Sequence, residues 1–178
     1  MVYDAKKPKK ETIMKQKNPT ALAAWNLYPL TRDPAIIAFL VKNDGDAILA
    51  QARELLEQSW QGGADPALAT ALQDRLIDYL WQKSDDESGE QGAIELLSAL
   101  EALCRDLLAG GNRALKAAEN ALDYRLNYLT ETGADAAAIA EIQRQLPEQR
   151  AALAKASGKT LALGSDQEAL LTALGAAD

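Results

Sequence analysis

Histidine is absent from the 178-residue chain, and cysteine occurs once, at Cys104. Without imidazole there is no Ser-His or Cys-His couple, and without a second thiol there is no dithiol or disulfide chemistry. Zinc sites of ordinary composition are excluded because they draw on histidine and cysteine ligands. Cys104 lies in a leucine-rich stretch, which favours a small core residue over a nucleophile. We therefore expect no metal site and no cofactor.

Patterns typical of β-strands and membrane spans are also scarce. Valine occurs only twice, and no alternating apolar run extends beyond a few residues. No segment approaches the ~18 apolar residues of a spanning helix, and the N-terminus lacks the apolar core of a signal peptide. We expect a soluble, cytoplasmic protein that does not contact membranes.

Helix boundary signals are abundant instead. Asn18-Pro19 and Asp33-Pro34 each pair a capping side chain with proline at the first helical position, and Pro29 is expected to end the first helix. Between such signals, apolar residues recur at spacings of three and four, which is typical of helices with one buried face. The longest expected helices span residues 47–61, 66–83, 90–109 and 113–131. The sequence predicts an all-α fold, a helical bundle of about seven to eight helices.

Short connections predict how the later helices pack. The helices expected at 90–109 and 113–131 are joined by so short a turn that they should lie antiparallel. In the next helix, Pro147 is expected to produce a kink or an end, because its ring clashes with the preceding turn. Residues 165–168 have the pattern of a capping box before a last helix.

The charge distribution divides the chain into a basic arm and an acidic body. Residues 1–18 carry a net charge of +4, and the remaining 160 residues carry −11. The arm, residues 1–17, is expected to be disordered alone or docked on a partner. Residues 18–178 should form one helical domain, with two lobes (18–83 and 90–178, joined by the acidic loop 84–89) as the alternative. The arm's six lysines are Lys6, Lys7, Lys9, Lys10, Lys15 and Lys17.

Two short motifs resemble ligand-binding loops without their required context. Gly158-Lys159-Thr160 matches the end of a phosphate loop, but the position of its first glycine holds Leu153 and a helix-forming stretch precedes it. Residues 43–46 lack the alternating carboxylates of a calcium loop and indicate a turn. We interpret both as helix boundaries.

Catalysis by paired carboxylates is the enzymatic alternative that remains open. It requires one carboxyl group in an apolar setting that raises its pKa, facing a second across a cleft. Most acidic residues instead occupy capping positions, the 84–89 loop, or polar helix faces, as Glu54, Asp74 and Glu101 do. We predict that the protein is not an enzyme.

Tyr124 and Tyr128 stand four residues apart, on one face of the helix expected at 113–131, with Arg125 between them. Tyrosine and arginine are enriched at the centres of protein interfaces, although helix packing within a chain uses the same residues. We take these three residues as a candidate partner-binding face.

The leading hypothesis is a non-enzymatic assembly subunit of a larger complex of protein subunits. Apolar helix faces would dock on those subunits, and the lysine arm would meet an acidic partner. The alternative is an accessory subunit that binds nucleic acid through its phosphates without base specificity, because the arm has lysines but neither arginine nor interleaved aromatics. The acidic body counts against this alternative. Its candidate phosphate contacts are Arg105, Arg113, Arg144 and Arg150.

Overall fold

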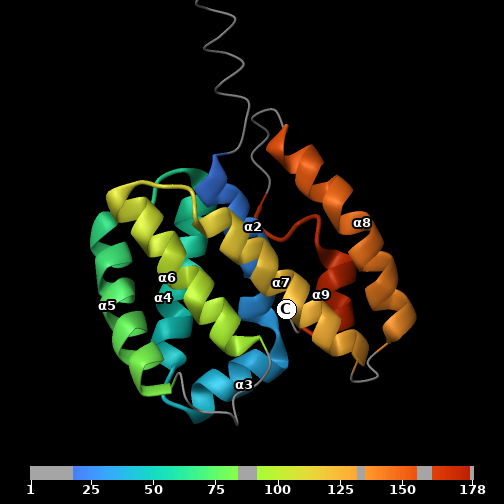
Figure 1. Ribbon diagram of the computed structural model, residues 1–178, viewed down its shortest axis with the longest axis horizontal. Coiled ribbons are helices and arrows are strands. Elements are labelled where there is room, and N and C mark those ends of the chain that lie inside the picture. The colour runs from blue at the N-terminus through green and yellow to red at the C-terminus, as the bar shows by residue number, and fades with distance from the viewer. Residues whose placement is uncertain (1–17, 84–91, 132–134, 156–161, 177–178) are drawn as a thin grey trace, which may run out of the picture.

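The computed structural model describes residues 18–83, 92–131, 135–155 and 162–176. Within these ranges the chain forms eight helices and no strand, which confirms the all-α prediction (Figure 1). The basic arm, the acidic loop 84–89 and residues 158–160 lie outside the described residues. The helices are α2 (Pro19–Arg32), α3 (Pro34–Lys42), α4 (Asp46–Gln61), α5 (Pro66–Lys83), α6 (Ala93–Ala109), α7 (Ala114–Glu131), α8 (Ala136–Ala154) and α9 (Glu168–Leu174).

Two of the expected caps form as the sequence indicates. The Asn18 side chain accepts a hydrogen bond from the Ala21 backbone N–H at 2.8 Å, and Asp33 accepts one from Ala35 at 3.0 Å. Helix α4 begins one residue before the expected start at 47, with Gly45 at the capping position and Asp46 as the first helical residue. Local capping signals therefore mark the starts of α2 and α3.

Prolines inside α2 and α8 do not end these helices, contrary to the prediction for Pro29. Helix α2 continues to Arg32, and α8 runs through Pro147. Proline has no N–H, so Pro29 leaves the Trp25 carbonyl without its usual helical donor. The side-chain amide of Gln167, far along the chain, donates to that carbonyl at 2.9 Å. A tertiary hydrogen bond therefore replaces the one that proline removes.

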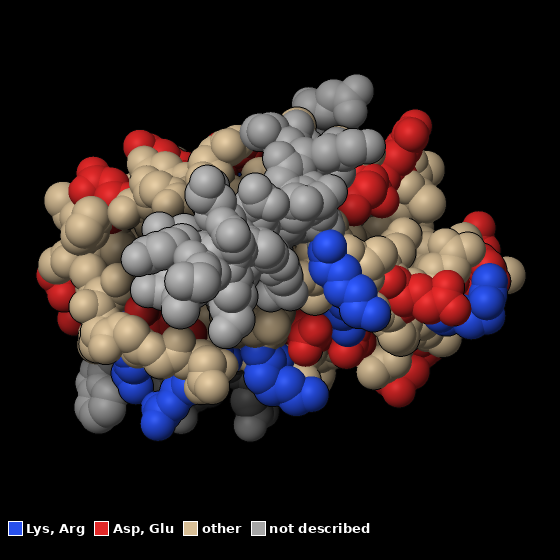
Figure 2. All heavy atoms as spheres, turned by 90° about the horizontal axis from the view of Figure 1, so that it is seen from above, with Lys and Arg blue, Asp and Glu red and all other residues tan. Residues whose placement is uncertain are grey.

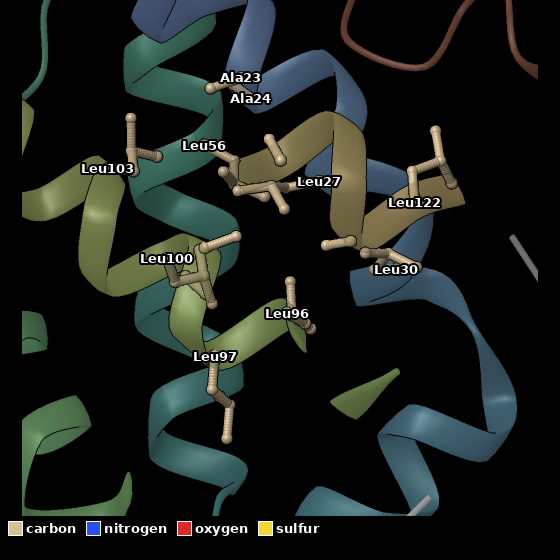
Figure 3. Close-up of a cluster of buried hydrophobic side chains, with 14 of the residues drawn as sticks. Ala23, Ala24, Leu27, Leu30, Leu56, Leu96, Leu97, Leu100, Leu103 and Leu122 are labelled. Carbon is tan, nitrogen blue, oxygen red and sulfur yellow. The ribbon is translucent and has the colours of Figure 1, made fainter. Parts of the chain in front are cut away.

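Helix α2 forms the centre of the molecule. It packs against α3, α4, α6, α7, α8 and α9, with its most extensive contacts on α7 and α4. Figure 3 shows leucines from α2, α4, α6 and α7 converging on one apolar cluster. Full burial of each such side chain contributes roughly 1.5–3 kcal/mol. The labelled leucines are Leu27, Leu30, Leu56, Leu96, Leu97, Leu100, Leu103 and Leu122.

Helices α6 and α7 pack against each other and run in opposite directions, as predicted (Figure 1). Their connection is stabilised by the Asp106 side chain, which accepts a hydrogen bond from the Ala114 backbone N–H at 2.8 Å. Gly111 has a φ of 124°, and a Cβ there would lie 3.0 Å from the Asp106 carboxylate. The turn therefore needs glycine both for its backbone conformation and for space.

Helices that precede residue 84 and helices that follow residue 91 share one apolar core. Helix α5 packs on α6, and α2 packs on α7, so helices from residues 18–83 share their apolar faces with helices from residues 92–131. None of the helices in the described ranges is long and apolar enough to cross a membrane.

Candidate functional site

The tyrosine-bearing face of α7 is built around a buried ion pair. The Arg125 side chain is 5% exposed and the Asp33 side chain 1% exposed. Arg125 Nε lies 2.6 Å from Asp33 Oδ2, and Arg125 Nη2 lies 3.2 Å from Oδ1. The sequence assigned Arg125 to a partner-binding face, whereas the structure places it inside. Its guanidinium therefore connects α7 to Asp33, the capping residue of α3.

The surroundings of Arg125 explain why the pair is held so closely. Asp33 also caps α3 through Ala35, so both its oxygens are engaged. A Cβ at Gly92 would lie 3.0 Å from Arg125 Cδ, which shows that the start of α6 packs on the arginine stem. The starts of α3 and α6 therefore both pack on the Arg125 side chain, and a paired, hydrogen-bonded charge is tolerated in such a site.

The two tyrosines lie on the outer side of this ion pair. The Arg125 guanidinium carbon is 5.6 Å from the Tyr128 ring centroid, a distance that allows a cation–π contact. Tyr128 is half-buried, while Tyr124 is 41% exposed. The pKa of Tyr124 is raised by partial loss of water and then by the negative charge of Glu95. Its hydroxyl therefore stays protonated at neutral pH and can donate or accept a hydrogen bond.

Other large apolar side chains are exposed on different helices. Val41 lies on α3, Ile77 on α5 and Leu108 on α6, each more than a third exposed. Ile77 has Trp81 four residues further along, but none of the three exposed residues is itself aromatic, so none of them forms an aromatic pair at this spacing. The Tyr124–Tyr128 pair is therefore distinguished by its composition and by the ion pair beneath it.

Two of the four arginines proposed as phosphate contacts pair with carboxylates on their own helix. Arg105 binds Glu101, and Arg144 lies 2.6 Å from Glu141, where the hydrogen bond lowers the pKa of Glu141 to about 2. Arg113 is exposed in the turn between α6 and α7. Where the face in Figure 2 is not covered by grey atoms, Lys and Arg form separate groups interspersed with Asp and Glu. A continuous phosphate track is not visible there.

Arg150 has an internal role that the sequence did not reveal. It donates to the Asn26 side-chain oxygen at 2.8 Å and to Asp123 at 3.0 Å, and it lies 3.9 Å from Glu119. These contacts tie α8 to α2 and α7. Asn26 is 1% exposed, and its position inside the apolar face of α2 was the available signal for a buried polar contact.

A pocket of about 200 Å³ opens beside Arg150, between α2, α7 and α8. Leu22, Trp25 and Leu153 contribute to its largely apolar wall, and Glu119 and Arg150 lie at its polar edge. A second hollow, of about 250 Å³, adjoins Arg150 on the side of Pro147. Both are smaller than the clefts that usually enclose drug-sized ligands.

The described residues hold no group of three or more His, Cys, Asp or Glu side chains arranged for a metal ion. Cys104 is buried, and burial raises the pKa of its thiol to about 12, with a further contribution from Glu101. This environment agrees with a core residue, as the sequence indicated. The six arm lysines lie outside the described residues.

Comparisons with protein-family models, with curated proteins and with solved structures found no match.

Proposed function

We propose that the protein is a non-enzymatic assembly subunit that docks onto a protein partner through the tyrosine-bearing face of α7. The observation that carries the proposal is the exposed Tyr124 ring, 41% accessible, on a helix fixed by the buried Arg125–Asp33 ion pair. Tyrosines at interfaces supply a large contact area at low cost in conformational entropy. The fixed backbone lowers that cost further, because the helix is already ordered before binding.

The charges around Tyr124 indicate the chemistry of the partner surface. The negative charges of Glu95 and Glu131 are close enough to raise the pKa of Tyr124, after the larger effect of partial burial. A complementary surface would place an apolar pocket over the tyrosine ring and basic residues around its edge. The lysine arm, by contrast, suits an acidic region of the same assembly.

The test is quantitative co-purification of tagged full-length protein from its native lysate, with Tyr124→Ala compared with wild type. We expect partners to be retained by wild type at about 0.5 M salt, where exposed charge interactions are screened, and to be depleted with Tyr124→Ala. Leu108→Ala is the matched control, because Leu108 is 37% exposed near the opposite end of the α6–α7 pair. Equal recovery with both variants would contradict the proposal.

The contribution of the arm is tested separately by removing residues 1–17. If the arm meets an acidic partner, its removal lowers recovery at low salt and has little effect at high salt. Nuclease treatment of half of each sample distinguishes a protein partner from nucleic acid. Loss of every partner after nuclease treatment would favour the nucleic-acid alternative and overturn the assembly proposal.

A further inference from the structure

Two half-buried arginines lie together at the C-terminal end of α2. Arg32 is the last residue of α2, and Arg53 comes from α4. Arg53 Nη2 donates to the Thr31 carbonyl oxygen at 2.8 Å. Arg32 Nε donates to the Tyr28 hydroxyl oxygen at 3.3 Å, and its guanidinium carbon is 5.6 Å from the Tyr28 ring centroid.

Neither arginine has an acidic partner in the part of the chain that the structure describes. The carboxylate nearest in sequence, Asp33, is already engaged by Arg125 and by the Ala35 N–H. The chain has 26 acidic residues and only 19 lysines and arginines, so carboxylates are in excess. Two neighbouring guanidinium groups without a carboxylate partner among the described residues are unusual in such a chain. The other half-buried or buried arginines, Arg125 and Arg150, both have carboxylate partners.

Arg53 has an unmet hydrogen-bonding requirement in addition to an unbalanced charge. Its Nε atom is buried and has no hydrogen-bond acceptor among the described residues. Burial lowers the pKa of Arg53, and the positive charge of Arg32 lowers it further. Both effects disfavour the charged guanidinium in the absence of a bound anion.

We propose that Arg32 and Arg53 form a binding site for a small oxyanion of the phosphate or carboxylate class. A guanidinium presents its donors in a planar fork that matches two oxygens of such an anion. The terminal guanidinium nitrogens of Arg53 and Arg32 would contact the anion, because both side chains are only half-buried, whereas the Arg53 Nε atom is buried. The Tyr28 hydroxyl accepts from Arg32, so its own proton is available for a bound oxygen.

The backbone at Gly164 packs against the Tyr28 ring and fixes its position. Gly164 has a φ of 87°, and a Cβ there would overlap the Tyr28 ring. The backbone around residue 164 therefore lies directly against the tyrosine. This contact orders the hydroxyl at the edge of the arginine pair before any anion binds.

A simpler explanation is that Arg53 only caps the C-terminal carbonyls of α2. Cationic side chains are favourable at such ends. A cap explains the bond from Nη2 to Thr31, but it does not explain why a second positive charge, that of Arg32, lies close enough to lower the pKa of Arg53. The two explanations predict different responses to added anions.

The full-length protein is titrated with sodium phosphate and, in a separate series, with sodium succinate. Sodium chloride at equal ionic strength is the reference in both series. The readouts are the melting temperature and the NMR resonance of the Arg53 Nε–H. We expect a saturable rise in melting temperature and a saturable shift of that resonance with one or both oxyanions. A response to phosphate or to succinate identifies the class of the anion.

Arg53→Gln and Arg32→Gln should each weaken the response about tenfold or more, because each removes a charged donor. Arg105→Gln is the matched control and should leave the response unchanged, because Arg105 is exposed and already paired with Glu101. If Arg53→Gln does not fold, Arg32→Gln and the wild-type NMR titration still distinguish anion binding from a capping role alone. No difference between oxyanions and chloride in the wild type would overturn the proposal and leave the capping role.

Discussion

At the scale of single residues, the ion pair between Asp33 and Arg125 joins two parts of the chain that are 92 residues apart. Both side chains are almost completely buried, and the pair joins α3, α6 and α7. Bringing two charges out of water is costly, and the cost is offset only while both are present. The pair therefore specifies how these helices meet, in addition to supporting the tyrosine-bearing face.

Replacing Arg125 by methionine should lower the free energy of unfolding by about 3–5 kcal/mol, because it leaves the Asp33 carboxylate buried without its partner. Adding Asp33→Asn should recover part of that loss, since the asparagine is neutral and can still cap α3. Urea denaturation of the two single variants and the double variant measures this. Arg105→Met, in an exposed pair, is the control with little expected change. Strictly additive losses would contradict a coupled pair.

A second prediction at this scale concerns Cys104. With the pKa of the thiol raised to about 12, the thiolate fraction at pH 8 is about a thousandth of that of a free cysteine. A disulfide reagent should therefore react with the native protein at least about a thousandfold more slowly than with the protein in urea. Absorbance at the reagent's product wavelength follows both rates. Rapid labelling of the native protein would mean that α6 opens readily.

At the scale of the elements, proline positions show how tertiary contacts extend helices beyond their local signals. Helix α2 passes through Pro29 because Gln167, which precedes α9, supplies a donor to the exposed carbonyl of Trp25. The same segment places Asp166 on the Trp25 indole N–H at 2.9 Å. Residues 165–168 therefore act as a docking segment more than as the capping box that their pattern indicates.

Gln167→Leu should lower the free energy of unfolding by about 1–2 kcal/mol, because the Trp25 carbonyl loses its donor. The loss lies toward the low end because the Gln167 Oε1 atom is itself buried without a hydrogen-bond partner. In a Pro29→Ala background the same substitution should cost less, since the alanine N–H can reach the Trp25 carbonyl. A double-mutant cycle by urea denaturation measures the difference, and equal costs in both backgrounds would contradict this account.

At the scale of the whole molecule, α2 shares its apolar surface with helices on both sides of the 84–91 segment. Leu27 and Leu30 lie in the same cluster as Leu100 and Leu122 (Figure 3). We therefore expect the described body to unfold as one cooperative unit rather than as two lobes.

A fragment of residues 18–83 should not fold independently, because removing α6 and α7 exposes the buried side of α2. Circular dichroism and an NMR correlation spectrum of this fragment, compared with residues 18–178, provide the measurement. We expect poor chemical-shift dispersion and no cooperative thermal transition. A well-dispersed, cooperatively melting fragment would establish the two-lobe alternative.

The sequence predicts the helices well and the functional contacts poorly, for one physical reason. Caps such as Asn18 and Asp33, and the apolar spacing between them, act within a few residues and can be read locally. The partner of Arg125 is 92 residues away, and the donor to Trp25 is 142 residues away. Which polar groups meet depends on the packing of all the helices, so Arg125 was assigned to the surface.

The bond between Trp25 and Asp166 makes the indole an internal optical sensor. Trp25 is 1% exposed, and its N–H is held by the segment that leads into α9. Detachment of that segment would bring water to the ring and shift its fluorescence emission to longer wavelengths. The shift would be assigned by comparison with Trp25→Phe. Attachment of the chain's last helix can thus be followed in real time without any added label.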